Sequence, residues 1–132
     1  MQASADFRSG SKRAIWAGRI ISGVVVLFLV LDAILHLAKP APVVEAFQRL
    51  GIPQSLSVGL GVLELVCLAL YLIPRTAPIG AVLLTGYLGG AIAIHMRAGS
   101  SWFETVVFPA IVAAMIWGGL ILRDRRAREL FG

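Results

Sequence analysis

Four long apolar stretches dominate the pattern of hydrophobic and polar positions along this chain. They cover approximately residues 14–38, 56–73, 78–96 and 102–122. A bilayer core about 30 Å thick is crossed by ~20 helical residues, so each stretch is long enough to span a membrane, the second with the least to spare. The stretches lack strict polar/apolar alternation and are far longer than the ~9–11 residues of a membrane strand. Because lipid offers the backbone no hydrogen-bond partners, the pattern predicts an all-α protein, an integral membrane four-helix bundle.

The loop between the first two stretches carries a helical pattern of its own. Its apolar positions Val43, Val44, Phe47 and Leu50 recur at helical spacing after Pro42. We therefore expect a short amphipathic helix that lies on the membrane surface or covers one end of the bundle. An irregular loop with chance spacing is the alternative for so short a segment.

Composition agrees with a membrane protein and excludes several other classes. Apolar residues make up 58% of the 132 residues and charged residues 14%, against roughly 45–50% and 25% in soluble domains. A soluble domain of this size has too little interior to bury so many apolar side chains. A single cysteine excludes a disulfide scaffold, and the high hydrophobicity excludes a disordered chain. We divide the chain into a polar N-terminal segment (1–13), a transmembrane domain (14–122) and a basic tail (123–132).

Basic residues indicate how the spans are oriented. With an even number of spans, both termini and the middle turn share one side of the membrane. Nine of the twelve Lys and Arg residues fall on that side, and Lys39, Arg49 and Arg97 fall on the other. This bias predicts cytoplasmic termini in the cytoplasmic (inner) membrane of a bacterium. The basic run from Arg123 to Arg128 directly follows a span, so membrane lipids with anionic headgroups are expected partners, and nucleic acid is not.

Ionisable residues within membrane spans are costly and therefore informative. Asp32 and His36 lie one turn apart in the first stretch, Glu64 lies in the middle of the second, and His95 lies near the outer end of the third. Steps of three and four residues place each of them on one seam of its helix. We expect these side chains to meet in the outer half of the bundle, as a polar cluster that opens outward. The candidate cluster comprises Asp32, His36, Glu64, His95, Arg97 and Glu104.

Four interpretations of this cluster stay open. Its groups can form interhelical hydrogen bonds and an ion pair, each worth ~0.6–2 kcal/mol, that only hold the helices together. They can instead form a site for a ligand or a proton. They can also ligate a metal, but their spacing matches no metal motif, and we predict no metal. Acid/base catalysis by the same groups is the fourth interpretation. No nucleophile is arranged with a histidine, so no catalytic residue is assigned and a stand-alone enzyme is not expected.

Small and aromatic residues add two expectations. Gly86 and Gly90 form a small-residue face that predicts close helix packing, within the chain or in a homo-oligomer. Tyr71, like the tryptophans, lies toward the end of a span, where aromatic side chains anchor helices at the membrane interface.

The order of motifs along the chain resembles one known family. An arginine opens the first span, an acid with a basic residue four positions later follows, and motifs bounded by proline and glycine come next. These segments are Arg19–Gly23, Asp32, Pro40–Phe47, Leu50–Pro53, Gly61–Leu65, Tyr71–Arg75, Leu84–Ala91 and His95–Arg97. Together they resemble the DoxX-like family of membrane proteins, and the resemblance covers nearly the whole chain, from Trp16 to Arg126.

The resemblance implies a small four-helix membrane protein that serves as an accessory subunit of a redox or quinone-linked membrane system, with membrane redox proteins as partners. It implies that Asp32, Glu64, His95 and Arg97 match the polar motif positions of the family. His36 departs from the family pattern, because members often have lysine there. The function expected on this basis is binding of an apolar ligand, such as a quinone, whose polar end contacts the cluster. The alternatives are a small-solute or proton-coupled carrier that acts as an oligomer, and a structural assembly partner without a ligand.

Overall fold

The computed structural model describes residues 2–130, and the side chains of residues 12–130. All regular structure in this part of the chain is helical, which confirms the expectation of an all-α protein. The elements are α1 (Gln2–Ala38), α2 (Ala41–Leu50), α3 (Leu56–Leu72), α4 (Ala77–Ala98), the π-helical turn η1 (Phe103–Val107), α5 (Phe108–Arg123) and α6 (Arg125–Glu129).

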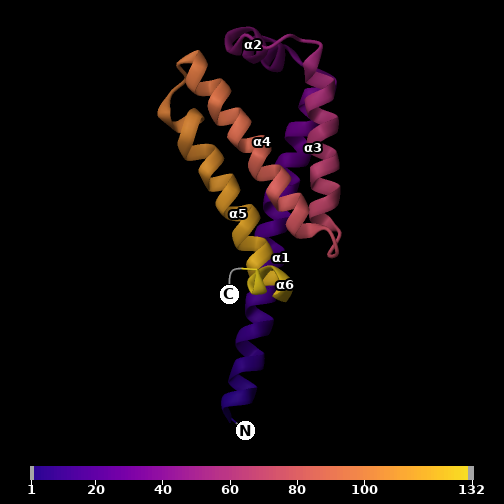
Figure 1. The fold of residues 1–132 in the computed structure, drawn as a ribbon, viewed down its shortest axis with the longest axis vertical. Coiled ribbons are helices and arrows are strands. Elements are labelled where there is room, and N and C mark those ends of the chain that lie inside the picture. Colours follow the sequence, from indigo (N-terminus) through magenta and orange to yellow (C-terminus); the bar gives the residue numbers. More distant parts are fainter. Residues whose placement is uncertain (1, 131–132) are drawn as a thin grey trace.

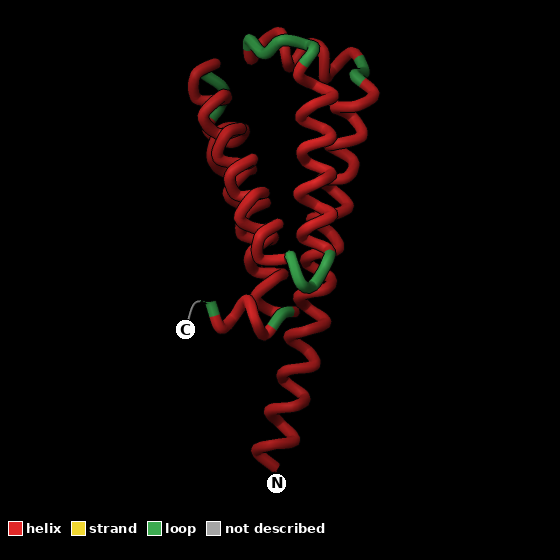
Figure 2. Tube along the Cα trace, turned by 45° about the vertical axis from the view of Figure 1, so that its right-hand side comes forward, coloured by secondary structure: helices red, strands yellow, loops and turns green. Residues whose placement is uncertain are grey.

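The helices α1, α3, α4 and α5 run side by side. α1 packs against α3 and α5, and α4 packs against the same two helices. Figures 1 and 2 show that the α1–α3 pair and the α4–α5 pair lie close together at one end and diverge toward the other. α2 lies across the diverging end, which we call the α2 end, and the opposite end is the α6 end. The apolar core between the helices includes Val25, Leu29, Leu68, Leu84, Val112, Ile116 and Leu120.

Three helical segments are long and apolar enough to cross a membrane, namely Lys12–Ala38, Ala77–Ala98 and Phe103–Arg123. α3 is an apolar helix of 17 residues and is shorter than these three. Large apolar side chains also cover the outside of the helices; Leu27 is 64% exposed and Val82 is 59% exposed. Such a surface suits contact with lipid tails and not with water. The chain is therefore a multi-pass membrane protein.

Both ends of the chain are helical within the described residues. α1 begins at Gln2, so residues 2–13 of the predicted N-terminal segment are continuous with the first apolar helix, and the division of the chain into segments stays a prediction. No proline interrupts this stretch of the sequence. In the basic tail, the Asp124 side chain accepts a hydrogen bond from the Arg126 backbone N–H at 2.9 Å and caps α6. Residues 131–132 of the tail lie outside the described residues.

α2 occupies the loop between α1 and α3. It follows Pro40 and ends at Gly51, whose φ of 71° is the left-handed conformation that commonly terminates a helix. Phe47 and Leu50 are buried, whereas Glu45 is exposed. The helix thus turns its apolar side toward the rest of the molecule.

At the α6 end the helices approach one another at glycines. A Cβ atom on Gly18 would lie 2.6 Å from the backbone nitrogen of Arg123 and 2.7 Å from the carbonyl oxygen of Gly119. A Cβ atom on Gly80 would collide with the backbone of Tyr71. Glycine lets helix backbones come this close. α1 is therefore held against α5, and α3 against α4, at this end of the molecule.

Tyr71 lies inside this contact and not at a membrane interface. Its side chain is fully buried, and its hydroxyl donates to the carbonyl oxygen of Ile116 at 2.7 Å and lies 3.1 Å from Ser22 Oγ. The expectation of an interfacial anchor is wrong for this residue. A phenol needs a hydrogen-bond partner when it is buried, and here α5 and α1 supply the partners that interfacial water would otherwise provide.

Candidate functional site

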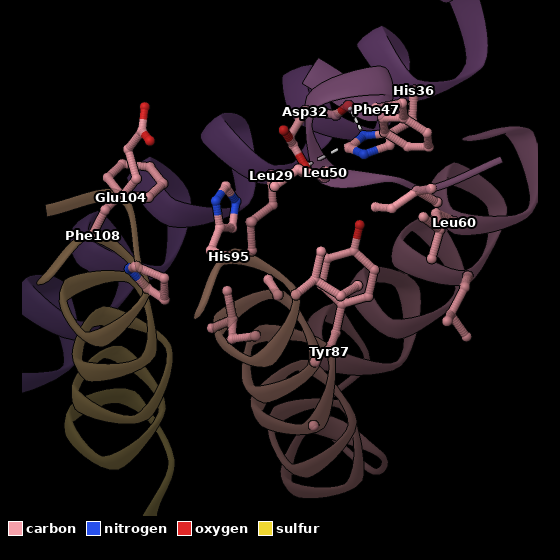
Figure 3. A pocket seen from close by; sticks show the side chains of 18 residues that line it. Leu29, Asp32, His36, Phe47, Leu50, Leu60, Tyr87, His95, Glu104 and Phe108 are labelled. Atoms are coloured by element: carbon pink, nitrogen blue, oxygen red, sulfur yellow. Dashed lines mark hydrogen bonds and ion pairs between the residues drawn. The ribbon is translucent and has the colours of Figure 1, made fainter. Parts of the chain in front are cut away.

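A cavity of about 400 Å³ lies between the diverging helix pairs at the α2 end. Residues from α1, α2, α3, α4, η1 and α5 line it, and most of the lining is apolar, including Leu29, Phe47, Leu60 and Phe108 (Figure 3). The polar side chains that reach it are Asp32, His36, Tyr87, His95 and Glu104. An apolar chamber with a few convergent polar groups is the usual form of a small-molecule site.

The turn η1 shapes one wall of this cavity. Proline has no backbone N–H, so Pro109 cannot donate the usual helical hydrogen bond to the carbonyl of Thr105. The backbone immediately before Pro109 forms the π-helical turn Phe103–Val107, which carries Glu104. Single π turns within helices are frequent at functional sites. Glu104, Phe108 and Pro109 all face the cavity.

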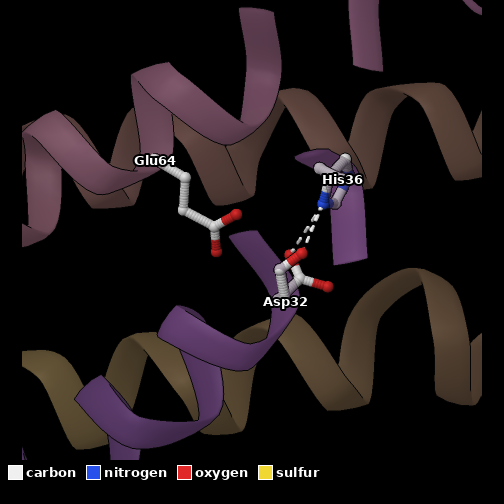
Figure 4. A group of neighbouring side chains, drawn as sticks. All are labelled: Asp32, His36 and Glu64. Atoms are coloured by element: carbon white, nitrogen blue, oxygen red, sulfur yellow. Dashed lines mark hydrogen bonds and ion pairs between the residues drawn. The ribbon is translucent and has the colours of Figure 1, made fainter. Parts of the chain in front are cut away.

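Asp32, His36 and Glu64 form a compact polar group beside the cavity. One potential ligand atom of each lies within 4.8 Å of the other two. The Nδ1 atom of His36 lies 2.8 Å from the backbone oxygen of Asp32 and 3.5 Å from its Oδ2. A carbonyl only accepts hydrogen bonds, so Nδ1 is the donor and Nε2 is left for another partner. Figure 4 shows the Glu64 carboxylate of α3 pointing toward this α1 pair. The structure thus brings three of the predicted residues together.

Glu64 is the most buried member of this group. Its side chain is 0% exposed, its Oε2 accepts a hydrogen bond from the Tyr87 hydroxyl at 3.3 Å, and its Oε1 has no hydrogen-bond donor among the described residues. A buried acceptor without a donor costs about 1–3 kcal/mol, and more when it is charged. The nearby Asp32 carboxylate offers only further acceptor oxygens unless it carries a proton. A proton shared by the two carboxylates, or a donor or cation from outside the described residues, would satisfy this oxygen.

The same three residues are chemically able to hold a divalent ion. Carboxylates and imidazole are ligands for several transition metals. Three protein ligands with one open position are typical of catalytic zinc sites. The motif spacing led us to predict no metal, and that statement stays a prediction.

The other predicted residues lie at different distances from the cavity. His95 lines it, with its Nδ1 3.0 Å from Ser100 Oγ, and Glu104 lines it from η1. Arg97 does not line it. Its Nη2 donates to the carbonyl oxygen of Leu50 at 3.1 Å and so joins the end of α4 to the end of α2. Arg97 therefore holds α2 across the α2 end.

Gly86 and Gly90 line the cavity and pack against no other helix within the described residues. A Cβ atom on either glycine would meet no atom within 4 Å. The close packing predicted for this face is not made within the chain. Because the two glycines have no side chains, the face of α4 that they form leaves space for the cavity.

Tyr87 belongs to the site, although the sequence reasoning missed it. It lines the cavity and donates to Glu64. Tyr87 lies eight residues before His95, which places both on the same face of the helix, and this spacing is the sequence signal that could have found it. A tyrosine in an apolar span is too common to stand out without the position of its neighbours.

A family model described as the DoxX-like family matches residues 20–119. The match covers most of the chain and every residue that lines the cavity, so the chain belongs to the DoxX-like family. No curated protein and no solved structure matches it significantly. The resemblance drawn from the order of motifs is confirmed.

Proposed function

We propose that this DoxX-like protein binds an apolar molecule with one polar end, of the quinone or lipid class. In this proposal it acts as a small accessory subunit of a redox or quinone-linked membrane system. The observation that carries the proposal is the cavity of about 400 Å³, which is mainly apolar and has its polar groups on one side. The apolar body of a ligand fills the chamber, and its polar end meets Asp32 and His36, which line the cavity next to the buried Glu64.

The polar end of the cavity is richer in acceptors than in donors. Asp32 and Glu64 offer carboxylate oxygens, and His36 offers Nε2, because its Nδ1 already donates to a carbonyl. A hydroxyl group on the ligand supplies a donor to this acceptor-rich group through Asp32 or His36, which line the cavity. The site is therefore expected to prefer a quinol, or another hydroxyl-bearing apolar molecule, over the corresponding quinone.

The membrane topology that goes with this proposal has four spans and cytoplasmic termini. α3 is the shortest of the spans, at 17 residues, or roughly 26 Å of helix at 1.5 Å per residue. A small amount of local thinning accommodates such a span. Arg75 and the arginines of α6 lie at the α6 end, which the positive-inside bias assigns to the cytoplasm. The cavity then opens in the outer half of the cytoplasmic membrane.

Native mass spectrometry of the full chain released from lipid nanodiscs tests the proposal. We expect one retained organic molecule per chain. Its occupancy should fall at least about tenfold in Glu64→Gln, because the amide puts an N–H donor beside Asp32 and His36 and so disturbs their hydrogen bonds to the ligand, each worth about 1.5–3 kcal/mol when one partner is charged. Glu45→Gln makes the same chemical change at an exposed position of α2 and should leave the occupancy unchanged. Loading with a quinol and with its quinone then compares the two oxidation states directly.

Two results would contradict the proposal. A bare chain in every lipid tested, or equal occupancy in Glu64→Gln and Glu45→Gln, would favour a structural assembly partner. A retained divalent ion that is lost in Glu64→Gln would assign the polar group to a metal and overturn the prediction that none is bound.

A further inference from the structure

A second cavity, of about 340 Å³, lies at the α6 end, remote from the cavity described above. Three parts of the chain meet there: α1, the turn between α3 and α4, and the junction of α5 with α6. The charged residues that line it are Arg19, Arg75, Arg123, Arg126 and Asp124. Four guanidinium groups and one carboxylate thus share one small hollow.

The four arginines of this cavity form no ion pair within residues 12–130. The ion pairs of residues 12–130 are His36 with Asp32 and Arg125 with Glu129, and neither includes an arginine of the cavity. The only acid in the wall, Asp124, is engaged as the cap of α6 through the backbone N–H of Arg126. Gathering like charges without counter-ions is unfavourable. The cavity therefore favours an anionic partner.

Arg123 is held in a fixed position in the wall. Its Nη2 donates to the carbonyl oxygen of Tyr71 at 2.9 Å, and its guanidinium lies 4.6 Å from the centroid of the Tyr71 ring. The close contact of Gly18 with the Arg123 backbone fixes the helix itself. The Nε atom of Arg123 is buried and has no acceptor within the described residues. A guanidinium that is already held in place needs little reorganisation to bind an anion.

The surroundings of the cavity indicate where such an anion comes from. α3 ends at Leu72, α4 begins at Ala77 and α5 ends at Arg123, so the cavity lies where the apolar helices reach the membrane surface. On α1, Trp16 and Ile20 are each 62% exposed. The Cζ atom of Arg19 lies 5.6 Å from the centroid of the Trp16 ring. Exposed tryptophan is typical of the headgroup level. An apolar surface for acyl chains thus adjoins a cationic pocket for a headgroup.

We propose that the α6-end cavity binds the phosphate group of an anionic phospholipid. Guanidinium groups bind phosphate oxygens through paired, charge-assisted hydrogen bonds, and several arginines can share one phosphate. A zwitterionic headgroup is disfavoured, because its ammonium group would lie among the four arginines. The proposal goes beyond the function of the first cavity and does not depend on it.

Native mass spectrometry in nanodiscs that contain equal amounts of phosphatidylglycerol and phosphatidylcholine, with matched acyl chains, tests this site. We expect the full chain to retain phosphatidylglycerol preferentially. Arg126→Gln and Arg75→Gln should each lower that retention by about tenfold, as expected for the loss of a charge-assisted hydrogen bond. Arg125→Gln is the matched control, since Arg125 also lies on α6 but is 88% exposed, pairs with Glu129 and does not line the cavity. Both test positions are exposed, so their substitution should not impair folding.

Inorganic phosphate distinguishes a lipid from a soluble phosphate as the source of the anion. For a lipid site, millimolar phosphate should neither raise the melting temperature in detergent nor displace phosphatidylglycerol. Stabilisation by phosphate that is lost in Arg126→Gln, without a preference for phosphatidylglycerol, would overturn the lipid assignment and leave a soluble phosphate site. Equal retention of the two lipids without stabilisation by phosphate, or equal effects of Arg126→Gln and Arg125→Gln, would overturn the site altogether.

Discussion

Gly18→Ala should weaken the contact between α1 and α5. The added Cβ would lie 2.6 Å from the backbone nitrogen of Arg123 and 2.7 Å from the carbonyl oxygen of Gly119. Non-bonded carbon atoms prefer about 3.5 Å or more. Both obstructing atoms belong to the backbone, so no side chain can turn away and α5 itself has to retreat. A shift of close to 1 Å at this point removes dispersion contacts along the whole interface.

The magnitude follows from comparison with Gly23→Ala on the same helix. A Cβ on Gly23 would meet no atom within 4 Å. Both substitutions gain the same helix propensity, up to about 1 kcal/mol, and this gain cancels in the comparison. Overpacking a tight contact costs about 1–3 kcal/mol. We therefore expect Gly18→Ala to be less stable than Gly23→Ala by about that amount.

Unfolding of the two variants in mixed detergent micelles, followed by tryptophan fluorescence and circular dichroism, measures this difference. Gly18→Ala should unfold at a lower mole fraction of sodium dodecyl sulfate than Gly23→Ala, with the unmodified chain as reference. Equal midpoints, or a more stable Gly18→Ala, would refute the backbone contact between α1 and α5.

Three further predictions concern a buried hydrogen bond, the attachment of α2 and the membrane topology. Tyr71→Phe removes a fully buried hydroxyl and should lower the free energy of unfolding by about 1–2 kcal/mol; an unchanged unfolding midpoint would contradict the buried network. Arg97→Gln should speed amide hydrogen exchange in α2 while the exchange of α3 stays unchanged, because it removes the bond that ties α2 to α4; unaltered exchange in α2 would show that this bond does not hold it. An impermeant maleimide should label Gln48→Cys in intact cells but Arg125→Cys only after lysis. The native Cys67 is 2% exposed and should not be labelled in either case. The reverse labelling pattern would show that the topology is opposite to the one proposed.

Helix ends could be read from the sequence because the residues that terminate helices are chemically distinct. The expected third span, 78–96, differs from α4 (Ala77–Ala98) by one residue at its start and two at its end. Gly99, with a φ of 73°, terminates α4 as glycine commonly does. The first expected span ends at the last residue of α1 for a similar reason, since Pro40 follows it. The start of α1 at Gln2 could not be read in this way, because polarity changes near residue 14 while the helix continues.

The polar group of Asp32, His36 and Glu64 could be anticipated because charged residues in a span are rare. The roles of Tyr71, Tyr87 and Arg97 could not. A tyrosine suits both an interface and a buried hydrogen bond, and the choice depends on how closely a neighbouring helix approaches. For Tyr71 the partners are Ile116 on α5 and Ser22 on α1, tertiary contacts that periodicity within one helix does not reveal. For Arg97 the role is set by the position of α2.

Glycines explain why one end of the molecule is closed and the other hollow. Gly18 and Gly80 lie in backbone contacts at the α6 end, whereas Gly86 and Gly90 face the cavity at the α2 end and touch no neighbour. Helices held together at one end and diverging at the other must enclose space between them, and α2 covers that space. Stability and the candidate ligand site are therefore supplied largely by opposite ends of the same helices. Substitutions near the first cavity, Glu64→Gln among them, should alter binding more than folding, and substitutions at Gly18 should do the reverse.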